Sequence, residues 1–362
     1  MLLPGAFSPA GGIEMYNRLL IKCVDKLCVD RGAEAHVLSL NDRAEVADSR
    51  YVTSPKLSYR SLHGSRPAFV GRALAAAVRG VTHVMVGHVN FGPLALAIRA
   101  ISRAQQWLFI YGIDAWRRLP CMKRRALNRA NLILSISDFT RHVCARSNRI
   151  DVDRIKLLPC ALDPLWQAQR DSAPGGAEVP QAPIVLTVTR LASSERYKGV
   201  DKVLEAMLQV RREVPNARYV LVGSGEDSAR LEQKVRDLGL SATVTFAGRV
   251  SEAELDSWYR RCTVFVLPSR REGFGIVFIE AGYYRKPVIG GDHAGSREVI
   301  VDGKTGFLVN HHNVDLLAKR IIGLLKDSGQ ARALGENGRA HVEEKFLYPE
   351  FCRRFIGFFS DP

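Results

Sequence analysis

The sequence lacks any run of about 18 uncharged apolar residues, so it predicts no transmembrane helix. Its first residues, MLLPGAFSPAGG, lack the basic flank and the apolar stretch of a secretory signal. The seven cysteines are scattered, odd in number and never spaced C-x-x-C, which fits neither a disulfide framework nor a zinc site. These absences lead us to expect a cytoplasmic protein.

Acidic residues are nearly missing from one long segment. Residues 50–149 contain 17 lysines and arginines but only two acids, Asp114 and Asp138. The formal charge of the whole chain is +15, of which residues 1–165 carry +12. Such a basic half is either a solvated surface without a partner or a surface that attracts acidic lipids, a phosphate-bearing acceptor or nucleic acid. Its most concentrated stretch is RRLPCMKRR, residues 117–125.

Apolar runs alternate with helix-patterned stretches along the whole chain. The runs are continuous and rich in β-branched residues, which is typical of parallel strands covered by helices on both faces. Since 362 residues are enough for two domains, the sequence predicts an α/β protein with two Rossmann-like, doubly wound parallel sheets. The predicted strands are AHVLSL (35–40), HVMVGH (83–88), WLFIYG (107–112), LILSIS (132–137), IVLTVT (184–189), RYVLVG (218–223), TVTFAG (243–248), TVFVLP (263–268) and PVIGG (287–291).

A segment rich in proline, glycine and alanine, residues 171–183, separates the two series of strands. We therefore expect an N-terminal domain at 1–165, a linker at 166–182 and a C-terminal domain at 183–345. The remaining segment, 346–362, is aromatic and amphipathic and predicts a helix. This helix either packs on the C-terminal domain or crosses back to the N-terminal domain.

Two glycine-containing turns follow predicted strands. Gly11 and Gly12 precede a helix-patterned stretch, and Gly223 ends the strand RYVLVG. Glycine lets the backbone approach a ligand closely, and the free amides at a helix start favour an anion by roughly 0.3–2 kcal/mol. Each of these turns can equally be only a tight turn between a strand and a helix.

The EGFG segment is the strongest of the glycine-containing turns. Gly273, Phe274 and Gly275 lie between the strand TVFVLP and a helix that is predicted from about Ile276. They therefore present main-chain N–H groups at a helix N-terminus, where anions bind.

Two cations and two carboxylates surround these turns. Arg190 and Lys198 follow a strand at the carboxyl edge of the second sheet, where they suit a diphosphate or are simply exposed loop residues. Glu272 precedes the EGFG helix and Glu280 lies within it. Because a diphosphate would repel both carboxylates, we expect them to bind hydroxyl groups rather than to act as the acid/base pair of a glycosidase. The alternative is a helix-terminal charge and a solvated glutamate.

Taken together, these motifs resemble those of a known family. The order GGIE, TRL with a distal KG, VGSG, EGFGIVFIEA and GSREVIVDGKTGFLV is similar to the retaining family-4 glycosyltransferases, glycosyl transferases group 1, over residues 8–345. The resemblance implies the GT-B fold, in which two Rossmann-like domains face an interdomain cleft. It also implies a nucleotide-sugar donor held mostly by the C-terminal domain and an acceptor held mainly by the N-terminal domain.

The resemblance also implies roles for individual residues. Arg190 and Lys198 would neutralise the donor diphosphate, and Glu280 would bind the ribose hydroxyls. Glu272, with the EGFG amides, would hold the donor sugar. The remaining donor-binding candidates are Gly12, Gly223, Val250 beside the base, Gly273, Phe274, Gly275 and Ile276.

Four further candidates lie in the N-terminal half. Many relatives have a histidine where this chain has Tyr111, which either hydrogen-bonds a sugar hydroxyl or only packs there. Asp114, in the same loop, contacts a sugar, accepts the acceptor's proton or caps a helix. His88 and Ser137 are the acceptor-side candidates, with structural roles as the alternative.

The expected reaction is transfer of a hexose from a nucleotide-diphosphate sugar to a glycan or lipid-linked acceptor in cell-surface polysaccharide or glycolipid synthesis. The cations take the place of a metal, so we expect no metal and no cofactor beyond the donor substrate. The basic half predicts peripheral docking on an anionic membrane surface, the inner face of the plasma membrane.

Three other kinds of protein remain as alternatives: a nucleotide-sugar isomerase, a glycan phosphorylase and a catalytically silent relative. A nucleic-acid-binding protein is a further one, although no nucleic acid is expected because the basic segment lacks interleaved aromatic residues.

Overall fold

The computed structural model describes residues 1–7, 11–43, 48–171 and 182–359. The chain divides into two compact units. The N-terminal unit comprises Met1–Trp166 together with Leu347–Pro362, and the C-terminal unit comprises Gln167–Phe346. Most of the predicted linker, residues 172–181, lies outside the described residues. In the part of the chain that the structure describes, no helix is long and apolar enough to span a membrane.

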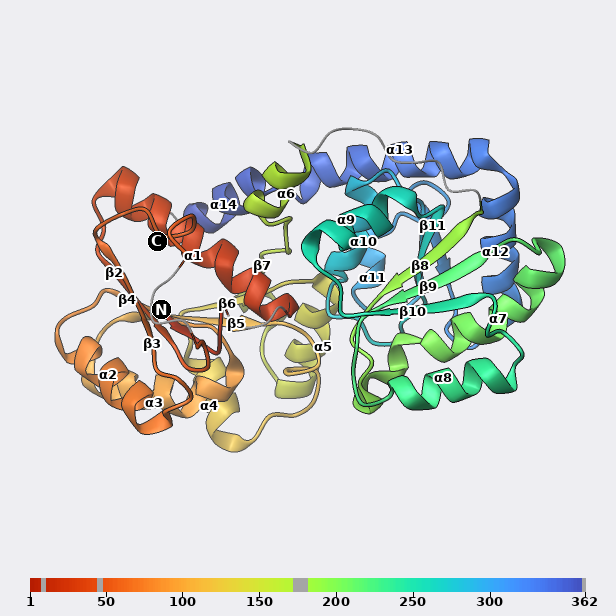
Figure 1. Ribbon diagram of the computed structural model, residues 1–362. Helices are drawn as coiled ribbons and strands as arrows, with labels where there is room; N and C mark the ends of the chain where they lie inside the picture. Colours follow the sequence, from red (N-terminus) through yellow and green to blue (C-terminus); the bar gives the residue numbers. More distant parts are fainter. Residues whose placement is uncertain (8–10, 44–47, 172–181, 360–362) are drawn as a thin grey trace. The chain divides into compact units, whose positions relative to one another are not determined.

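Within its described residues, the N-terminal unit contains a seven-stranded parallel sheet in the order β3-β2-β1-β4-β5-β6-β7 (Figure 1). The first strand has only two residues, yet it is central: Leu2 pairs with Leu38 on one side and with Val86 on the other. The strands are β1 (Leu2–Leu3), β2 (Ala35–Ser39), β3 (Leu57–Ser61), β4 (His83–Val86), β5 (Gln105–Ile110), β6 (Leu132–Ser135) and β7 (Ile155–Leu157).

Helices cover both faces of this sheet. Helices α1 and α14 lie on one face, while α2, α3 and α4 lie together on the other (Figure 1). The helices of the unit are α1 (Gly12–Arg31), α2 (Arg66–Val78), α3 (Gly92–Ile101), α4 (Cys121–Arg129), α5 (Asp138–Asn148) and α14 (Tyr348–Gly357), with 3₁₀ turns η1 (Val89–Phe91) and η2 (Val152–Arg154).

The last helix of the chain, α14, packs on the N-terminal unit. The ring of Phe351 meets Tyr16 of α1 edge to face, with centroids 5.3 Å apart. Phe355 is fully buried and lies 6.0 Å from the ring of Trp107 in β5. The aromatic residues that give this segment its amphipathic pattern therefore pack into the core of the N-terminal unit.

The C-terminal unit contains a second parallel sheet, with six strands in the described residues and the order β10-β9-β8-β11-β12-β13. The order reverses between the neighbouring central strands β8 and β11, which makes the carboxyl ends of these two strands the natural place for a ligand. The strands are β8 (Ile184–Val188), β9 (Arg218–Val222), β10 (Val244–Gly248), β11 (Val264–Leu267), β12 (Val288–Gly291) and β13 (Gly306–Val309).

Helices α7 and α8 cover one face of the second sheet, and α9 and α10 cover the other (Figure 1). Helix α12 packs on α7, and α13 packs on α10. The helices are α6 (Pro164–Asp171), which starts in the N-terminal unit, α7 (Val200–Glu213), α8 (Ser228–Asp237), α9 (Glu252–Arg261), α10 (Ile276–Tyr283), α11 (Ser296–Val299), α12 (Val314–Lys326) and α13 (Ser328–Lys345), with the 3₁₀ segment η3 (Ser193–Lys198).

The predicted pair of doubly wound parallel sheets is confirmed, and each predicted strand is present with bounds that differ by one or two residues; β5 begins two residues earlier than predicted. The structure adds three strands that the apolar pattern missed, β3, β7 and β13. All three lie at sheet edges, where one side of a strand needs no continuous apolar run. The strand expected before Gly11 and Gly12 is β1, which has only two residues.

Candidate functional site

The predicted cations and the EGFG turn follow adjacent strands of the second sheet. Arg190 comes two residues after β8 ends, and Lys198 closes the η3 segment that follows. Glu272 lies in the turn between β11, the neighbour of β8, and helix α10. Because parallel strands end at the same sheet edge, the topology brings these residues to one rim of the C-terminal unit.

Both predicted diphosphate-binding cations pair with one carboxylate, that of Glu195. The guanidinium of Arg190 meets Oε1 of Glu195, and Nζ of Lys198 lies 3.0 Å from Oε2. The Arg190 side chain is 70% exposed, whereas that of Glu195 is only 13% exposed. All three residues line one hollow on this unit, so its wall carries two cations paired with a largely covered anion. The sequence reasoning missed Glu195, although it lies within the same SSERYKG loop as Lys198.

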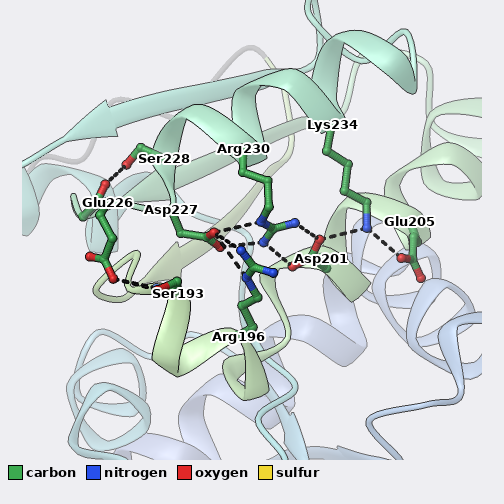
Figure 2. Close-up of polar contacts among 10 residues, drawn as sticks. Ser193, Arg196, Asp201, Glu205, Glu226, Asp227, Ser228, Arg230 and Lys234 are labelled. Atoms are coloured by element: carbon green, nitrogen blue, oxygen red, sulfur yellow. Dashed lines mark hydrogen bonds and ion pairs between the residues drawn. The ribbon is translucent and has the colours of Figure 1, made fainter.

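An ion network borders this hollow (Figure 2). Arg196 donates to Asp227 at 2.8 Å, and Arg230 bridges Asp227 and Asp201. Lys234 completes the chain by donating to Asp201 at 2.9 Å. Burial opposes the ionisation of Asp201, but hydrogen bonds from Arg230 and Lys234 outweigh it and hold the pKa of Asp201 far below its usual range. These charges are thus paired with one another, and they fasten η3, α7 and α8 together.

The glycines of the VGSG turn are required by close packing of the chain. Gly223 has a φ of 134°, and an added Cβ would overlap the carbonyl oxygen of Thr189. An added Cβ at Gly225 would likewise overlap the carbonyl oxygen of Leu191. The N–H of Gly223 donates to the carbonyl of Gly248 at 2.8 Å, so this amide is already occupied. The structure therefore supports the tight-turn interpretation of Gly223, and its role in donor binding stays a prediction.

The EGFG turn has the helix start that the sequence predicts. Helix α10 begins at Ile276, and its N-cap Gly275 has a φ of 98°, a left-handed conformation that favours glycine. The turn is braced from outside, because the N–H of Gly295 donates to the carbonyl of Glu272 at 2.8 Å. The Phe274 ring is buried against Phe346, with centroids 5.6 Å apart, so only the backbone of Phe274 is available to a ligand.

The two glutamates of this segment are both half-buried. Burial raises the pKa of Glu272, while the charge of Lys198 and the backbone N–H of Gly273 oppose that rise. Burial also raises the pKa of Glu280, whose Oε2 accepts a 2.8 Å hydrogen bond from the Tyr259 hydroxyl. Glu280 thus has a fixed partner within the unit, and its role in ribose binding stays a prediction. The N–H of Arg270 donates to the carbonyl of Tyr197 at 2.8 Å, which joins the loops that follow β8 and β11.

In the N-terminal unit, Tyr111 and Asp114 belong to one buried turn after β5. The Tyr111 hydroxyl donates to Oδ1 of Asn17 at 3.1 Å, and its ring packs edge to face on Tyr16. Asp114 accepts the backbone N–H of Tyr111 at 3.2 Å, so it closes a loop turn and is not the N-cap of a helix. Burial raises the pKa of Asp114 to about 6. Asn17, which the sequence reasoning missed, links this turn to α1.

The acceptor-side candidates have structural partners. Nδ1 of His88 accepts the N–H of Asn90 at 3.1 Å, which caps η1, and burial lowers the His88 pKa. The Ser137 hydroxyl is fully buried and accepts the N–H of Thr140 at 3.2 Å, which caps α5. For both residues the structure supports the structural alternative that the sequence left open.

The last two donor-binding candidates are Gly12, at the start of α1, and Val250, after β10. Gly12 is the exposed first residue of α1, and residues 8–10 before it lie outside the described residues. Val250 is half-buried and follows β10. Among the residues that the structure describes, no three histidines, cysteines or acids gather as a metal ion would need.

Comparisons with known proteins agree with this picture. The family described as Glycosyl transferases group 1 matches residues 170–341. A GDP-mannose-dependent alpha-(1-6)-phosphatidylinositol monomannoside mannosyltransferase of Mycobacterium tuberculosis is 29% identical over 264 residues, 67% of this chain and 66% of that protein. Its counterpart in Mycolicibacterium smegmatis is 30% identical over 62% of this chain and 61% of that protein. The aligned region thus spans somewhat less than two thirds of each of these relatives.

Solved structures extend the likeness to the whole chain. Sucrose-phosphate synthase from Thermosynechococcus elongatus superposes with a TM-score of 0.80 at 23% identity, covering 99% of this chain and 97% of that one. Anabaena Alr3699/HepE, solved with UDP and glucose, gives a TM-score of 0.79 at 18% identity and covers 100% of this chain and 99% of that one. At such identities the likeness concerns the fold. The chain thus has the predicted GT-B fold, and its residues 170–341 match the family of glycosyl transferases group 1.

Proposed function

We propose that this chain is a retaining hexosyltransferase that uses a nucleotide-diphosphate sugar, without a metal ion, to glycosylate a glycan or lipid-linked acceptor. The observation that carries the proposal is the rim of the C-terminal unit, where Arg190 and Lys198 share Glu195 and follow β8, the neighbour of the strand that leads into the EGFG turn. The names of the relatives, which include mannosyltransferases that use GDP-mannose, support the same reaction class.

The cations of the rim can stabilise the negative charge that develops during the reaction. As the bond between the anomeric carbon and the phosphate oxygen breaks, negative charge builds on the leaving diphosphate. Arg190 can fork across two oxygens and Lys198 adds a point charge, and removing one such stabilising group typically costs about 10²–10³ in rate. The acceptor oxygen bonds to the same carbon, and its proton passes to the leaving phosphate.

The other predicted residues have roles that fit their positions. Glu272 and the backbone of the EGFG turn hold hydroxyls of the donor sugar, and Glu280 binds the ribose. In the N-terminal unit, the turn that contains Tyr111 and Asp114 is the candidate for sugar contacts, although both side chains also serve that turn itself.

A thermal-shift panel of nucleotide sugars tests this function, since a ligand that binds only the folded protein raises its melting temperature. GDP-mannose and UDP-glucose come first, because they occur in the names of relatives and neighbours. We expect one donor to stabilise the C-terminal unit and to yield product only with an acceptor. Nucleoside diphosphate release without such a product would favour an isomerase, and no shift with any donor would contradict the proposal.

We further propose that the face formed by α2, α3 and α4 docks on an anionic membrane. Helix α3 packs against both α2 and α4, so the three form one layer. Several apolar side chains are also exposed there, including Val78 at 70% and Met122 at 54%. Arginines are attracted to acidic headgroups, and exposed apolar side chains can insert at the boundary between the headgroups and the acyl chains. The exposed arginines on or beside this layer are Arg66, Arg72, Arg79, Arg99, Arg103, Arg117, Arg118, Arg125 and Arg129.

Liposome flotation tests the membrane surface. We expect recovery with acidic vesicles and little with neutral ones, and a loss of recovery when Arg117, Arg118, Arg125 and Arg129 are replaced by alanine. A matched control replaces four exposed cations of the C-terminal unit, Arg211, Arg212, Lys319 and Arg332. Equal recovery with both vesicle types would remove this proposal, and salt-sensitive retention of RNA or DNA on filters would favour a nucleic-acid partner.

A further inference from the structure

The hydroxyl of Tyr259 is aimed at one oxygen of Glu280. Tyr259 lies on α9, its side chain is fully buried, and its hydroxyl donates to Oε2 of Glu280 at 2.8 Å. Its ring stacks on Tyr284, with centroids 5.1 Å apart and planes at 8°, and lies 6.0 Å from the ring of Phe265. Because the ring is fully buried and packs on two other aromatic rings, packing fixes the position of its hydroxyl oxygen beside Glu280.

Two further charged groups, Glu252 and Arg170, act on the Glu280 carboxylate. Burial raises the Glu280 pKa, the hydrogen bond from Tyr259 is the largest opposing effect, and Glu252 and Arg170 act with opposite signs at longer range. Arg170 is already engaged, because it donates to Glu252 at 2.7 Å and to the Tyr284 hydroxyl at 3.0 Å. Burial also raises the pKa of Tyr259 well above its ordinary value, so Tyr259 stays a donor at neutral pH.

We propose that Tyr259 is a positioning residue for nucleotide binding: its hydroxyl fixes one carboxylate oxygen of Glu280 and leaves the other for the ribose hydroxyls of a nucleoside diphosphate. This inference rests on the proposed function, because it takes Glu280 as the ribose-binding residue. A carboxylate that is orientated before the ligand arrives loses less conformational entropy on binding. The hydrogen bond from Tyr259 also favours the charged form of Glu280, which is the stronger acceptor for the ribose hydroxyls.

The variant Tyr259→Phe removes only the hydroxyl and keeps the stacked ring. Tyr219→Phe is its matched control. Tyr219 lies in β9 of the same unit, is equally buried, and donates its hydroxyl to Thr187 at 3.1 Å, away from Glu280. Both variants lose one buried hydrogen bond, so a general loss of stability affects both, whereas a role at Glu280 affects only Tyr259→Phe.

The first measurement needs no ligand. Carbon-13 NMR of protein labelled in its glutamate carboxyl groups follows the titration of Glu280, whose signal is identified by its loss in Glu280→Gln. We expect the Glu280 pKa to be higher in Tyr259→Phe than in the wild type and in Tyr219→Phe, because burial is then less opposed. An unchanged Glu280 titration in Tyr259→Phe would overturn the inference.

The second measurement is calorimetric titration with GDP and with UDP at several pH values. For whichever nucleotide binds the wild type, we expect Tyr259→Phe to weaken binding about tenfold. As the pH is lowered, the affinity of the variant should begin to fall at a higher pH than that of the wild type, because its Glu280 takes up a proton earlier. Tyr219→Phe should bind normally. Weaker binding by Glu280→Gln with normal binding by Tyr259→Phe would overturn this inference alone. Normal binding by Glu280→Gln, or none by the wild type, would count against the proposed function instead.

Discussion

Lys198 and Arg190 are bound to the two oxygens of one carboxylate, that of Glu195, and not to separate partners. The pairing holds the two cations at a fixed spacing at the end of β8. It also means that an arriving diphosphate competes with Glu195 for them. The behaviour of this rim towards anions therefore depends on three side chains, of which the sequence singled out two.

Replacing Lys198 or Glu280 by alanine should lower glycosyl transfer about tenfold or more, because each removes a charged contact to the donor. The fold should survive, since Lys198 lies at the end of a surface segment and Glu280 is only half-buried. Steady-state kinetics with the donor found by thermal shift, together with melting curves, checks this. Lys319→Ala, on the exposed face of α12, is the control. Unchanged turnover in both site variants would contradict the site assignment.

Glu195→Gln should bind nucleoside diphosphate about fivefold more tightly at low salt. The variant keeps the shape of the side chain but removes a negative charge from the rim, so the phosphates meet less repulsion. The gain should shrink as salt rises, because the rim is open to solvent. Titration calorimetry at two ionic strengths measures both effects. Weaker binding by the variant would show instead that alignment of Arg190 and Lys198 matters more than competition for them.

Gly223→Ala should destabilise the C-terminal unit by several kcal/mol, roughly 3 or more, because the new methyl group overlaps the carbonyl of Thr189 at a positive φ. Gly323→Ala is the matched contrast. Gly323 lies inside helix α12 with open space around it, so alanine there should stabilise the helix by about 0.5–1 kcal/mol. Urea unfolding of the two variants compares them, and equal midpoints would refute the packing argument.

The stability of the N-terminal unit should depend on the protonation of Asp114. The folded pKa of Asp114, about 6, is raised above its ordinary value, so the folded state binds this proton more tightly than the unfolded chain does. The contribution is fully present below about pH 4 and is lost as pH rises to about 6, a loss of up to about 3 kcal/mol.

Asp114→Asn should flatten this part of the pH dependence, since asparagine keeps an oxygen for the Tyr111 N–H but carries no charge. Free energies of unfolding at pH 4.5 and 7.5 test it. Asp138→Asn is the control, because the Asp138 carboxylate is 45% exposed. An equal slope in the wild type and in Asp114→Asn would contradict the assignment.

Local pattern was enough to predict the elements that form the rim. The strand TVFVLP, the glycines of EGFG and the helix from Ile276 are adjacent in the chain, so the preference of each residue acts on its neighbours. The alternation of apolar runs and helices likewise determined two parallel sheets, because only crossover helices can join parallel strands. The pairing order was not available from the pattern, and edge strands such as β3 and β7 carry too little apolar sequence to be found.

The sequence by itself thus determined the fold class, the helix start at Ile276 and the identity of the charged residues at the carboxyl edge of the second sheet. Only the tertiary structure decided that Glu195 joins Arg190 to Lys198, that Tyr259 holds Glu280, and that α14 packs on the first sheet. The physical reason is the same in each case. Hydrogen bonds and ring contacts between distant segments depend on burial and on which strands are neighbours, and neither is written in a local run of residues.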